Sequence, residues 1–194
     1  MKHLGIYVHV PFCVKKCRYC DFASWAGREN DMQRYVQAVA DEMRRKADAL
    51  GHPTADTVFF GGGTPTLLPA ALLKQLCDAV KDSFQLAENA EWTSEMNPGT
   101  ITNEKAAALF EGGVNRVSMG VQSASERLLK SIGRIHTAED AVKAAEIVSA
   151  AGIKRLNADM MLALPGMSKK DAEDTARFVL GLGVKHISCY ALIP

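Results

Sequence analysis

Several features that mark common protein classes are missing from this chain of 194 residues. It contains no run of about 18 apolar residues, so no segment has the composition of a membrane-spanning helix. The 23 basic residues nearly balance the 22 acidic ones, and no basic stripe or charged tail favours nucleic-acid binding. The first residues form a strand pattern without the apolar core of a signal peptide. The odd number of cysteines does not suit a disulfide framework, so we expect a cytoplasmic protein.

Three of the five cysteines lie close together but lack a fourth neighbour. Cys13, Cys17 and Cys20 have C-x3-C-x2-C spacing, whereas a fully ligated cubane iron–sulfur cluster takes four cysteines. Three thiolates on so short a loop would bind three irons of a [4Fe–4S] cluster and leave the fourth iron open to a small ligand. Two alternatives remain at this point, a zinc site completed by His9 and thiols that bind nothing. The other two cysteines, Cys77 and Cys189, are isolated, and we expect both to pack in the interior.

Strand patterns alternate with helical patterns along the chain. Runs of β-branched and aromatic residues predict six strands, at residues 4–10, 57–60, 91–96, 114–119, 153–161 and 184–191. Helical spacing of apolar residues predicts helices between them, for example from Asp31 to Gly51 and from Pro69 to Phe84. Six such units are too few for a closed eight-stranded barrel. We therefore predict an α/β fold, an open (β/α)6 partial TIM barrel, with a doubly wound open sheet as the alternative.

Capping signals predict where several helices begin. Thr102 is expected to cap a short helix that ends at Gly112 and Gly113. A Ser or Thr followed three residues later by an acidic residue has the spacing of a capping box. This spacing occurs at Ser123 with Glu126, at Thr137 with Asp140 and at Ser168 with Asp171.

Each predicted strand is followed by a polar group or by bare backbone. In parallel sheets of this kind, ligands bind at the carboxyl ends of the strands. These ends carry the cysteine loop, the glycine run at residues 61–66, and the side chains of Glu95, Gln122 and Asp159. The glycine run lacks the Lys-Ser/Thr pair of a phosphate-binding loop, so it either brings backbone close to a ligand or forms a plain turn. Taken singly, Glu95 would be an ordinary strand-end carboxylate and Arg134 a surface residue.

Together these groups predict a cofactor pocket beside a metal cluster. An open iron suits a small chelating ligand, such as the amine and carboxylate of an amino acid, and the nearby side chains would then hold a ribose and a base. That combination predicts S-adenosyl-L-methionine (SAM) bound to a [4Fe–4S] cluster. In such a site the cofactor supplies the radical chemistry and the protein supplies binding and orientation.

The motifs at these places resemble those of the radical SAM superfamily, over nearly the whole chain from Tyr7 to Pro194. More closely, they are similar to the group that contains the oxygen-independent coproporphyrinogen III dehydrogenases (HemN) and the heme chaperones (HemW). The resemblance is carried by residues 7–20, by residues 61–66 (Gly-Gly-Gly-Thr-Pro-Thr), 95–98 (Glu-Met-Asn-Pro), 120–123 (Gly-Val-Gln-Ser) and 159–166 (Asp-Met-Met-Leu-Ala-Leu-Pro-Gly).

The resemblance implies a role for each matching residue. Cys13, Cys17 and Cys20 would bind the [4Fe–4S] cluster, and Tyr7 and Tyr19 would lie beside SAM near the cluster. It assigns no catalytic side chain. Further contacts, to this SAM or to a second one, would come from Gly62, Gly63, Thr64, Glu95, Gln122, Arg134, Asp159 and the backbone of Ala191.

Two residues distinguish the members of this group. The dehydrogenase motif continues Cys-Gly-Cys, whereas here Cys20 is followed by Asp21 and Phe22, as in the heme chaperones. The resemblance therefore implies a heme chaperone that binds a cluster and SAM and transfers heme to acceptor proteins. The alternative is an oxygen-independent coproporphyrinogen III oxidase of porphyrin biosynthesis, so whether the protein is an enzyme stays open. A radical SAM enzyme that modifies RNA is disfavoured by the net charge of +1.

The last residues, up to Pro194, read as a strand that has just ended. We therefore expect residues 1–194 to be the radical SAM core domain of a longer protein, without its C-terminal domain. The resemblance places the heme-binding segment of the chaperones in that further region. Heme or a porphyrin is the expected partner, and the sequence identifies neither the electron donor nor the heme acceptor.

Overall fold

The computed structural model describes residues 4–192, so Pro194 lies outside the described residues. At its centre is a six-stranded sheet in the order β1-β4-β5-β6-β7-β8, in which all neighbouring strands are parallel. Spatial order follows sequence order without the reversal that defines a doubly wound sheet. The strands are β1 (Leu4–Val10), β4 (Thr54–Gly62), β5 (Gln85–Met96), β6 (Arg116–Gln122), β7 (Arg155–Leu162) and β8 (His186–Ala191).

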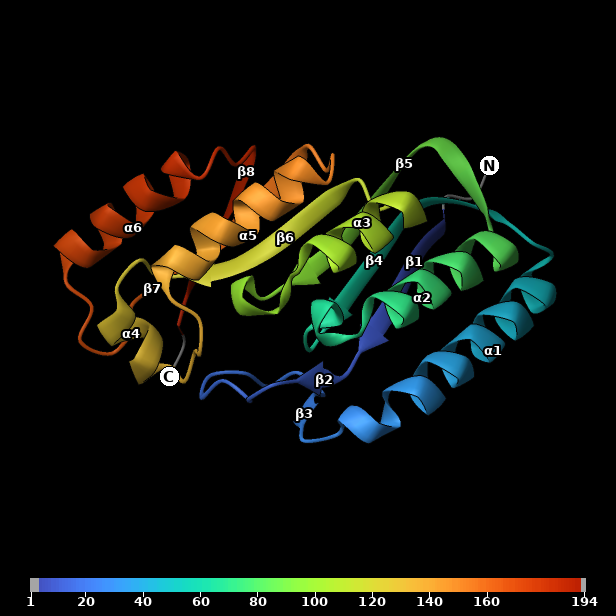
Figure 1. Ribbon diagram of the computed structural model, residues 1–194, viewed down its shortest axis with the longest axis horizontal. Coiled ribbons are helices and arrows are strands. Elements are labelled where there is room, and N and C mark those ends of the chain that lie inside the picture. The colour runs from blue at the N-terminus through green and yellow to red at the C-terminus, as the bar shows by residue number, and fades with distance from the viewer. Residues whose placement is uncertain (1–3, 193–194) are drawn as a thin grey trace.

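Helices connect the strands and lie on one face of the sheet (Figure 1). Helices on one face only are the arrangement of a barrel, whereas a doubly wound sheet is covered on both faces. The predicted open (β/α)6 partial barrel is therefore confirmed. The helices are α1 (Met32–Leu50), α2 (Ala70–Ser83), α3 (Asn103–Gly112), α4 (Glu126–Ser131), α5 (Ala138–Ala150) and α6 (Lys169–Gly181), with short 3-10 turns η1 (Glu29–Asp31), η2 (Pro65–Leu67) and η3 (Pro98–Thr100).

Some strand boundaries differ from those predicted. β4 and β5 both begin several residues earlier than the apolar runs indicated, at Thr54 and Gln85, because polar residues extend both strands. A second, two-stranded sheet was not predicted. It pairs β2 (Phe12–Cys13) with β3 (Trp25–Ala26) inside the cysteine loop, and strands of two residues are too short to show an alternating pattern.

Three of the predicted helix caps are confirmed. The side chains of Thr137 and Ser168 accept the backbone N–H groups of Asp140 and Asp171, and both aspartates bond back to the cap, so α5 and α6 each begin with a capping box. At α3, the side chain of Thr102 accepts the backbone N–H at the third helical position. These caps fix where the helices start relative to the strand ends before them.

The capping box predicted from Ser123 and Glu126 is wrong. Ser125 is the N-cap residue of α4, and it makes no side-chain cap hydrogen bond. Ser123 is fully buried, and its Oγ accepts the backbone N–H of Ser125 at 3.1 Å and lies 3.3 Å from Thr175 Oγ1. The hydroxyl therefore ties the exit of β6 to α6 instead of starting a helix.

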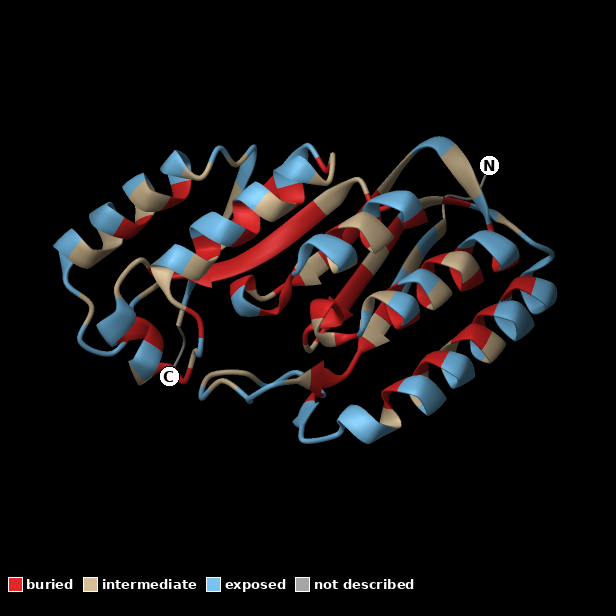
Figure 2. Ribbon diagram, in the orientation of Figure 1, coloured by how far each residue is buried: buried red, intermediate tan, exposed pale blue. Residues whose placement is uncertain are grey.

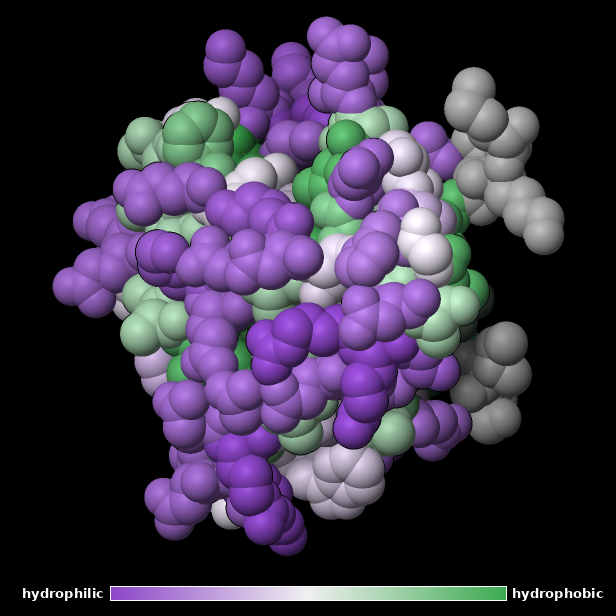
Figure 3. All heavy atoms as spheres, turned by 90° about the vertical axis from the view of Figure 1, so that its right-hand side faces the viewer, coloured by the Kyte–Doolittle hydropathy of each residue, from purple (hydrophilic) through white to green (hydrophobic). Residues whose placement is uncertain are grey.

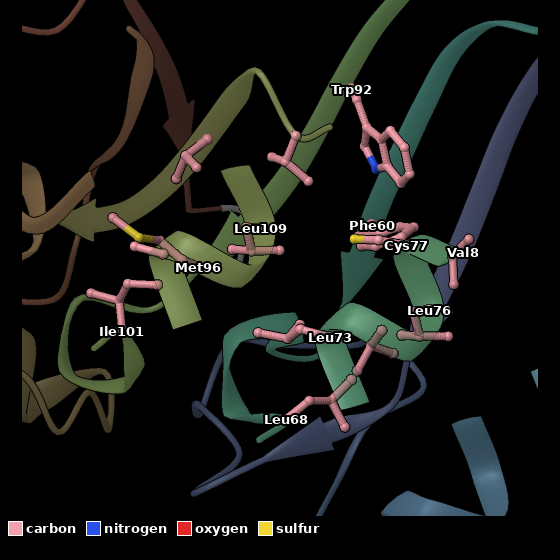
Figure 4. Packing of buried hydrophobic residues seen from close by; sticks show 14 of the residues in the cluster. Val8, Phe60, Leu68, Leu73, Leu76, Cys77, Trp92, Met96, Ile101 and Leu109 are labelled. Carbon is pink, nitrogen blue, oxygen red and sulfur yellow. The ribbon is translucent and has the colours of Figure 1, made fainter. Parts of the chain in front are cut away.

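The main hydrophobic core fills the space between the sheet and the helices (Figures 2 and 4). Cys77 on α2 is buried in this core, as predicted, and burial raises the pKa of its thiol to about 12. The expectation for Cys189 is wrong, because this residue is exposed on β8. β8 is the last strand of the sheet, and most of its residues are only partly covered.

The concave face of the sheet carries polar side chains instead of a second apolar layer. Near the start of the strands, Glu91 lies 3.9 Å from Arg116 and 3.6 Å from Arg155. The outer surface on the α1 side is mostly hydrophilic, with only small apolar areas (Figure 3). No helix within residues 4–192 is long and apolar enough to cross a membrane. Polar and charged side chains are thus concentrated on the concave face of the sheet and at the carboxyl ends of its strands.

Candidate functional site

A cavity of about 540 Å³ lies at the carboxyl ends of the strands, and residues from all six strand exits line it. This is where the loops of a parallel barrel bind their ligands. All of the predicted site residues except Tyr7 line the cavity, namely Cys13, Cys17, Cys20, Tyr19, Gly62, Gly63, Thr64, Glu95, Gln122, Arg134, Asp159 and Ala191.

Tyr7 does not reach the cavity lining, and its side chain is 59% exposed. Its ring stacks on Phe59 with 6.1 Å between the centroids, and its hydroxyl lies 3.1 Å from His9 Nδ1. His9 Nε2 is 2.7 Å from the carbonyl oxygen of Ala23. A carbonyl only accepts, so Nε2 carries the proton and Nδ1 accepts from Tyr7. The structure therefore connects Tyr7 to the cysteine loop through His9, and not to the predicted cofactor pocket directly.

The cysteine loop extends from the end of β1 to η1 and is fixed at a few points. Its two ends meet where the Trp25 N–H donates to the carbonyl oxygen of Pro11 at 2.8 Å. In its middle, the Arg18 N–H donates to the carbonyl oxygen of Ile132 at 3.0 Å, next to the end of α4. Many residues between these points are exposed, and the three cysteines are half-buried and unpaired. The loop thus presents three free thiols to the cavity.

The arrangement of the thiols fits a cluster better than a single metal ion. No three His, Cys, Asp or Glu side chains among the described residues are placed to hold one metal ion. Both ring nitrogens of His9 make hydrogen bonds, so His9 could complete the zinc site of the alternative only by breaking one of them. A cubane binds each thiolate through a different iron, so its cysteines need not converge on one point. Burial raises the pKa of Cys17, Arg134 opposes this, and Cys20 and Cys13 add to it, so cationic iron would offset the crowding of three thiolates.

The glycine run packs against the protein instead of offering free amides. A Cβ at Gly62 would lie 2.5 Å from the ring of His9, and one at Gly63 would lie 2.7 Å from the carbonyl oxygen of Phe12. The N–H groups of Gly63 and Thr64 donate to the carbonyl oxygens of Val10 and Phe12, both at 2.8 Å. The N–H groups of residues 62–64 are therefore all bonded within the described chain, and the predicted contact of this run with a ligand stays a prediction. The glycines allow the cysteine loop to pack closely on the end of β4.

Glu95 is a partly buried carboxylate with little support. It accepts the Gly62 N–H at 3.1 Å. Burial raises the pKa of Glu95 to about 7, the Gly62 hydrogen bond opposes the shift, the charge of Asp159 adds to it, and Arg134 opposes it. A carboxylate that is this poorly compensated on a cavity wall suits a cationic or hydrogen-bond-donating ligand group.

Arg134 joins the far wall of the cavity to the cysteine loop. Its Nε and one terminal nitrogen donate to the hydroxyl oxygen of Tyr19 at 3.2 and 2.9 Å. Burial raises the pKa of Tyr19 to about 12 although Arg134 opposes the shift. Nearby, Gln122 is buried with a φ of 67°, a left-handed conformation that is strained for a residue with a side chain. Such backbone strain is concentrated at functional sites, which agrees with the predicted role of Gln122.

The cavity also contains residues that the sequence alone did not suggest. Lys15, Lys16 and Phe22 belong to the cysteine loop and could have been inferred from their position in it. Asn97 could not be inferred from the sequence in this way. Its buried Oδ1 has no hydrogen-bond partner within the described chain and thus offers an acceptor to a ligand. The other additional lining residues are Asp21, Ser24, Met96, Ser118, Gly120, Met161, Tyr190 and Leu192.

A cysteine loop that faces a cavity at the mouth of a (β/α)6 partial barrel defines a protein that combines a metal cluster with a small organic cofactor. The chain belongs to the radical SAM superfamily, since the family model described as "Radical SAM superfamily" matches residues 7–179. Membership implies a [4Fe–4S] cluster and SAM, and the thiols and polar walls described above fit both. When bound, they supply radical chemistry that protein side chains lack.

Curated relatives are heme chaperones. The chain is 40% identical over 190 residues to the heme chaperone HemW of Escherichia coli, which covers 97% of this chain and 50% of the relative. It is 36% identical over 188 residues to HemW of Bacillus subtilis, covering 96% of this chain and 50% of the relative. The chain therefore spans about half the length of these relatives.

Among solved structures, the chain is similar to coproporphyrinogen III oxidase (HemN) of Escherichia coli. The TM-score is 0.91 at 26% identity, covering 98% of this chain and 44% of the other. A radical SAM methyltransferase, TsrM of Kitasatospora setae, shares the fold with a TM-score of 0.71 at 17% identity, covering 96% of this chain and 36% of the other. The predicted resemblance to the radical SAM superfamily and to its HemN and HemW group is therefore confirmed.

Proposed function

We propose that this chain is the radical SAM core of a heme chaperone, which binds a [4Fe–4S] cluster and SAM and delivers heme to acceptor proteins. The observation that carries the proposal is the match of nearly the whole chain to curated heme chaperones. The residues after the third cysteine, Asp21 and Phe22, support it, because they replace the Gly-Cys expected of the decarboxylating enzyme. We also propose that the protein is cytoplasmic, because the reducing cytoplasm keeps free thiols such as those in the cavity reduced.

Each wall of the cavity has a role in this proposal. Cys13, Cys17 and Cys20 bind three irons, and the fourth iron is open to the amino-acid part of SAM. Glu95 and Asp159 accept hydrogen bonds from ammonium or hydroxyl groups of the ligand. Gln122 and Arg134 contact SAM on the opposite wall, next to Tyr19, and Gly62, Gly63, Thr64 and Ala191 add contacts along the strand ends.

Residues 1–194 form, in this proposal, one core domain of a longer protein. The support is that the curated relatives are about twice as long as the chain. Heme, as cargo, would then need the further region as well as the core. The groups that this proposal assigns to the cluster and to SAM line the cavity of the core.

A second candidate function is oxidative decarboxylation of coproporphyrinogen III. It is favoured by one observation, the close structural similarity to coproporphyrinogen III oxidase. The identity to that protein is lower than to the heme chaperones, and the motif after Cys20 departs from the decarboxylating type. We therefore rank it second.

Anaerobic assays of the reconstituted full-length protein separate the two functions. The chaperone proposal predicts stoichiometric heme binding by spectral titration and transfer of that heme to an apo-hemoprotein, without conversion of coproporphyrinogen III. Formation of protoporphyrinogen from coproporphyrinogen III would contradict it and support the second candidate. A Cys17→Ala variant serves as a control that tests whether either activity depends on the cluster.

A further inference from the structure

A network of hydrogen bonds lies beneath Asp159 on the concave face of the sheet. At its centre is Asn157, which is 1% exposed. Its Nδ2 lies 2.7 Å from Asp159 Oδ1 and 2.6 Å from Ser118 Oγ on β6. Ser118 Oγ lies 3.1 and 3.3 Å from the two carboxylate oxygens of Asp159. On its other side, Asn157 Oδ1 contacts Ser188 Oγ at 3.2 Å and also His186 Nδ1, both from β8.

The direction of each hydrogen bond follows from the carboxylate of Asp159. An ionised carboxylate only accepts, so Ser118 donates its hydroxyl hydrogen to Asp159 and accepts from Nδ2 of Asn157. The amide nitrogen of Asn157 therefore faces Asp159, and its oxygen faces β8. Ser188 and His186 must then both donate to that oxygen, which places a proton on Nδ1 of His186. Ser118 and Asn157 therefore donate to Asp159, and Ser188 and His186 donate to Asn157.

The strand register explains how these residues meet. Ser118 lies opposite Asn157, and Asn157 lies opposite His186, so the three form one row across β6, β7 and β8. Asp159 and Ser188 lie opposite each other two residues further along the same strands. Side chains two residues apart on a strand share a face. The network is therefore built on the rigid sheet and not on the loops above it.

The support under Asp159 differs from that under Glu95, the other carboxylate of the cavity. Within residues 4–192, Glu95 accepts one backbone hydrogen bond, whereas Asp159 accepts three contacts from two side chains. Asn157 and Ser118 are buried and hydrogen-bonded. Such a satisfied pair fixes the geometry of the group that it supports, and orientation of a binding group before the ligand arrives favours affinity. Asn157 itself does not line the cavity and so acts only through Asp159.

From this geometry we propose that Asn157, with Ser118, is a positioning residue that holds Asp159 as an acceptor-only carboxylate for donor groups of the bound SAM. Ser188 and His186 fix the orientation of the Asn157 amide. The inference rests on the proposed function in taking SAM as the ligand. It adds that the selectivity of this wall for hydroxyl or ammonium groups depends on Asn157, which lies below the cavity, and on Ser118, which lines it.

A matched pair of substitutions at Ser118 isolates the hydroxyl group. Ser118→Thr and Ser118→Val add nearly the same shape to β6, but only threonine keeps the donor. In calorimetric titrations of anaerobically reconstituted protein with SAM, we expect Ser118→Thr to bind nearly as well as wild type. Ser118→Val should bind about tenfold more weakly, as expected for loss of a hydrogen bond to a charged group. Equal affinities of the two variants, with equal cluster content, would overturn the proposal.

A substitution at Asn157, the centre of the network, tests whether its side chain must donate a hydrogen bond to Asp159. Asn157→Asp keeps the size of the side chain but turns a second carboxylate toward Asp159, and like charges at this distance oppose each other. We expect SAM affinity to fall by more than about tenfold. The control is Asn115→Asp at the other end of the sheet, where Asn115 bridges the backbones of Ala90 and Trp92 and should leave SAM affinity unchanged.

Thermal unfolding of each variant separates lost binding from lost structure. If Asn157→Asp does not fold, the Ser118 pair alone decides the proposal. Wild-type affinity in a folded Asn157→Asp variant would overturn it while leaving the proposed function intact. If wild-type protein with an intact cluster does not bind SAM, the proposed function fails, and this inference fails with it.

Discussion

The two sides of the cavity are built in different ways. On one side, the cysteine loop has two-residue strands and many exposed residues, and hydrogen bonds hold it at several separate points. On the other side, β6, β7 and β8 carry Asp159 on a network of buried side chains. The comparison indicates that the sheet prepares the cofactor wall in advance, whereas the cysteine loop is held at separate points with exposed residues between them. Substitutions in the loop should therefore lower the cluster content, and substitutions on the strands should lower the affinity for SAM.

The largest effect is expected at the cysteines. Alanine at Cys13, Cys17 or Cys20 removes one of three iron ligands, so each variant should lose the brown colour and the bound iron and sulfide of reconstituted protein. The fold should persist, because the core between sheet and helices does not include these side chains. Iron and sulfide analysis with circular dichroism measures both properties.

Cys189→Ser is the matched control for these variants. Cys189 is also an unpaired, accessible cysteine, but it lies on β8 and does not line the cavity. Its replacement should leave the cluster content unchanged. Full cluster content in a Cys17→Ala variant, or cluster loss in Cys189→Ser, would contradict the assignment of the cysteine loop.

A smaller effect is expected at Glu95, where the Glu95→Gln substitution should raise stability but weaken SAM binding. Burial raises the pKa of Glu95 from 4.5 to about 7, so the folded protein without cofactor holds a proton that the unfolded chain releases. This contribution to stability is fully present below pH 4.5 and is lost as the pH rises through about 7. Glu95→Gln cannot ionise, so at a pH of about 8 it should be more stable than wild type by up to about 2–3 kcal/mol.

Urea unfolding of the two cofactor-free proteins at acidic and mildly alkaline pH measures this difference. The same variant should bind SAM more weakly by about tenfold or more, because it replaces a charged acceptor on the cavity wall. In wild type, SAM affinity should rise with pH through the ionisation of Glu95. Parallel pH dependences of stability in wild type and Glu95→Gln would show that Glu95 is not the titrating group.

The smallest effect is expected at the contact that joins the two sides. Tyr19→Phe removes the oxygen that accepts two hydrogen bonds from Arg134, while the ring stays packed. We expect the cluster to remain and SAM affinity to fall only several-fold, at the scale of about 1 kcal/mol. Tyr35→Phe is the control, since Tyr35 donates to the carbonyl oxygen of His9 at 2.7 Å and does not line the cavity. Similar losses of SAM affinity in both variants would show that the Arg134 contact has no special role.

Much of the fold could be predicted from the sequence because alternation is a local pattern. Strand and helix order, the partial barrel and the capping boxes at Thr137 and Ser168 all followed from spacing along the chain. The box at Ser123 did not form because its hydroxyl is used in the tertiary contact with Thr175, which no local pattern shows. Cys189 was expected inside because its strand pattern resembles a central strand, although β8 is at the edge of the sheet.

The site was predictable where a residue type is unusual and not where common residues act together. Cysteine spacing and a carboxylate in an apolar strand drew attention to the loop and to Asp159. Asn157 and Ser118 are ordinary strand residues, and only the register of β6, β7 and β8 brings them under Asp159. The close packing of the glycine run against His9 could not be predicted, because it requires the positions of two neighbouring strands.

The central claim is that a cluster on the cysteine loop and SAM on the strand wall share one cavity. Electron paramagnetic resonance of the reduced, reconstituted protein tests this claim most directly, with and without SAM. We predict the signal of a reduced [4Fe–4S] cluster whose shape changes on addition of SAM, and the change should be weaker in Glu95→Gln at the same SAM concentration. A cluster signal that saturating SAM leaves unchanged would contradict a shared site.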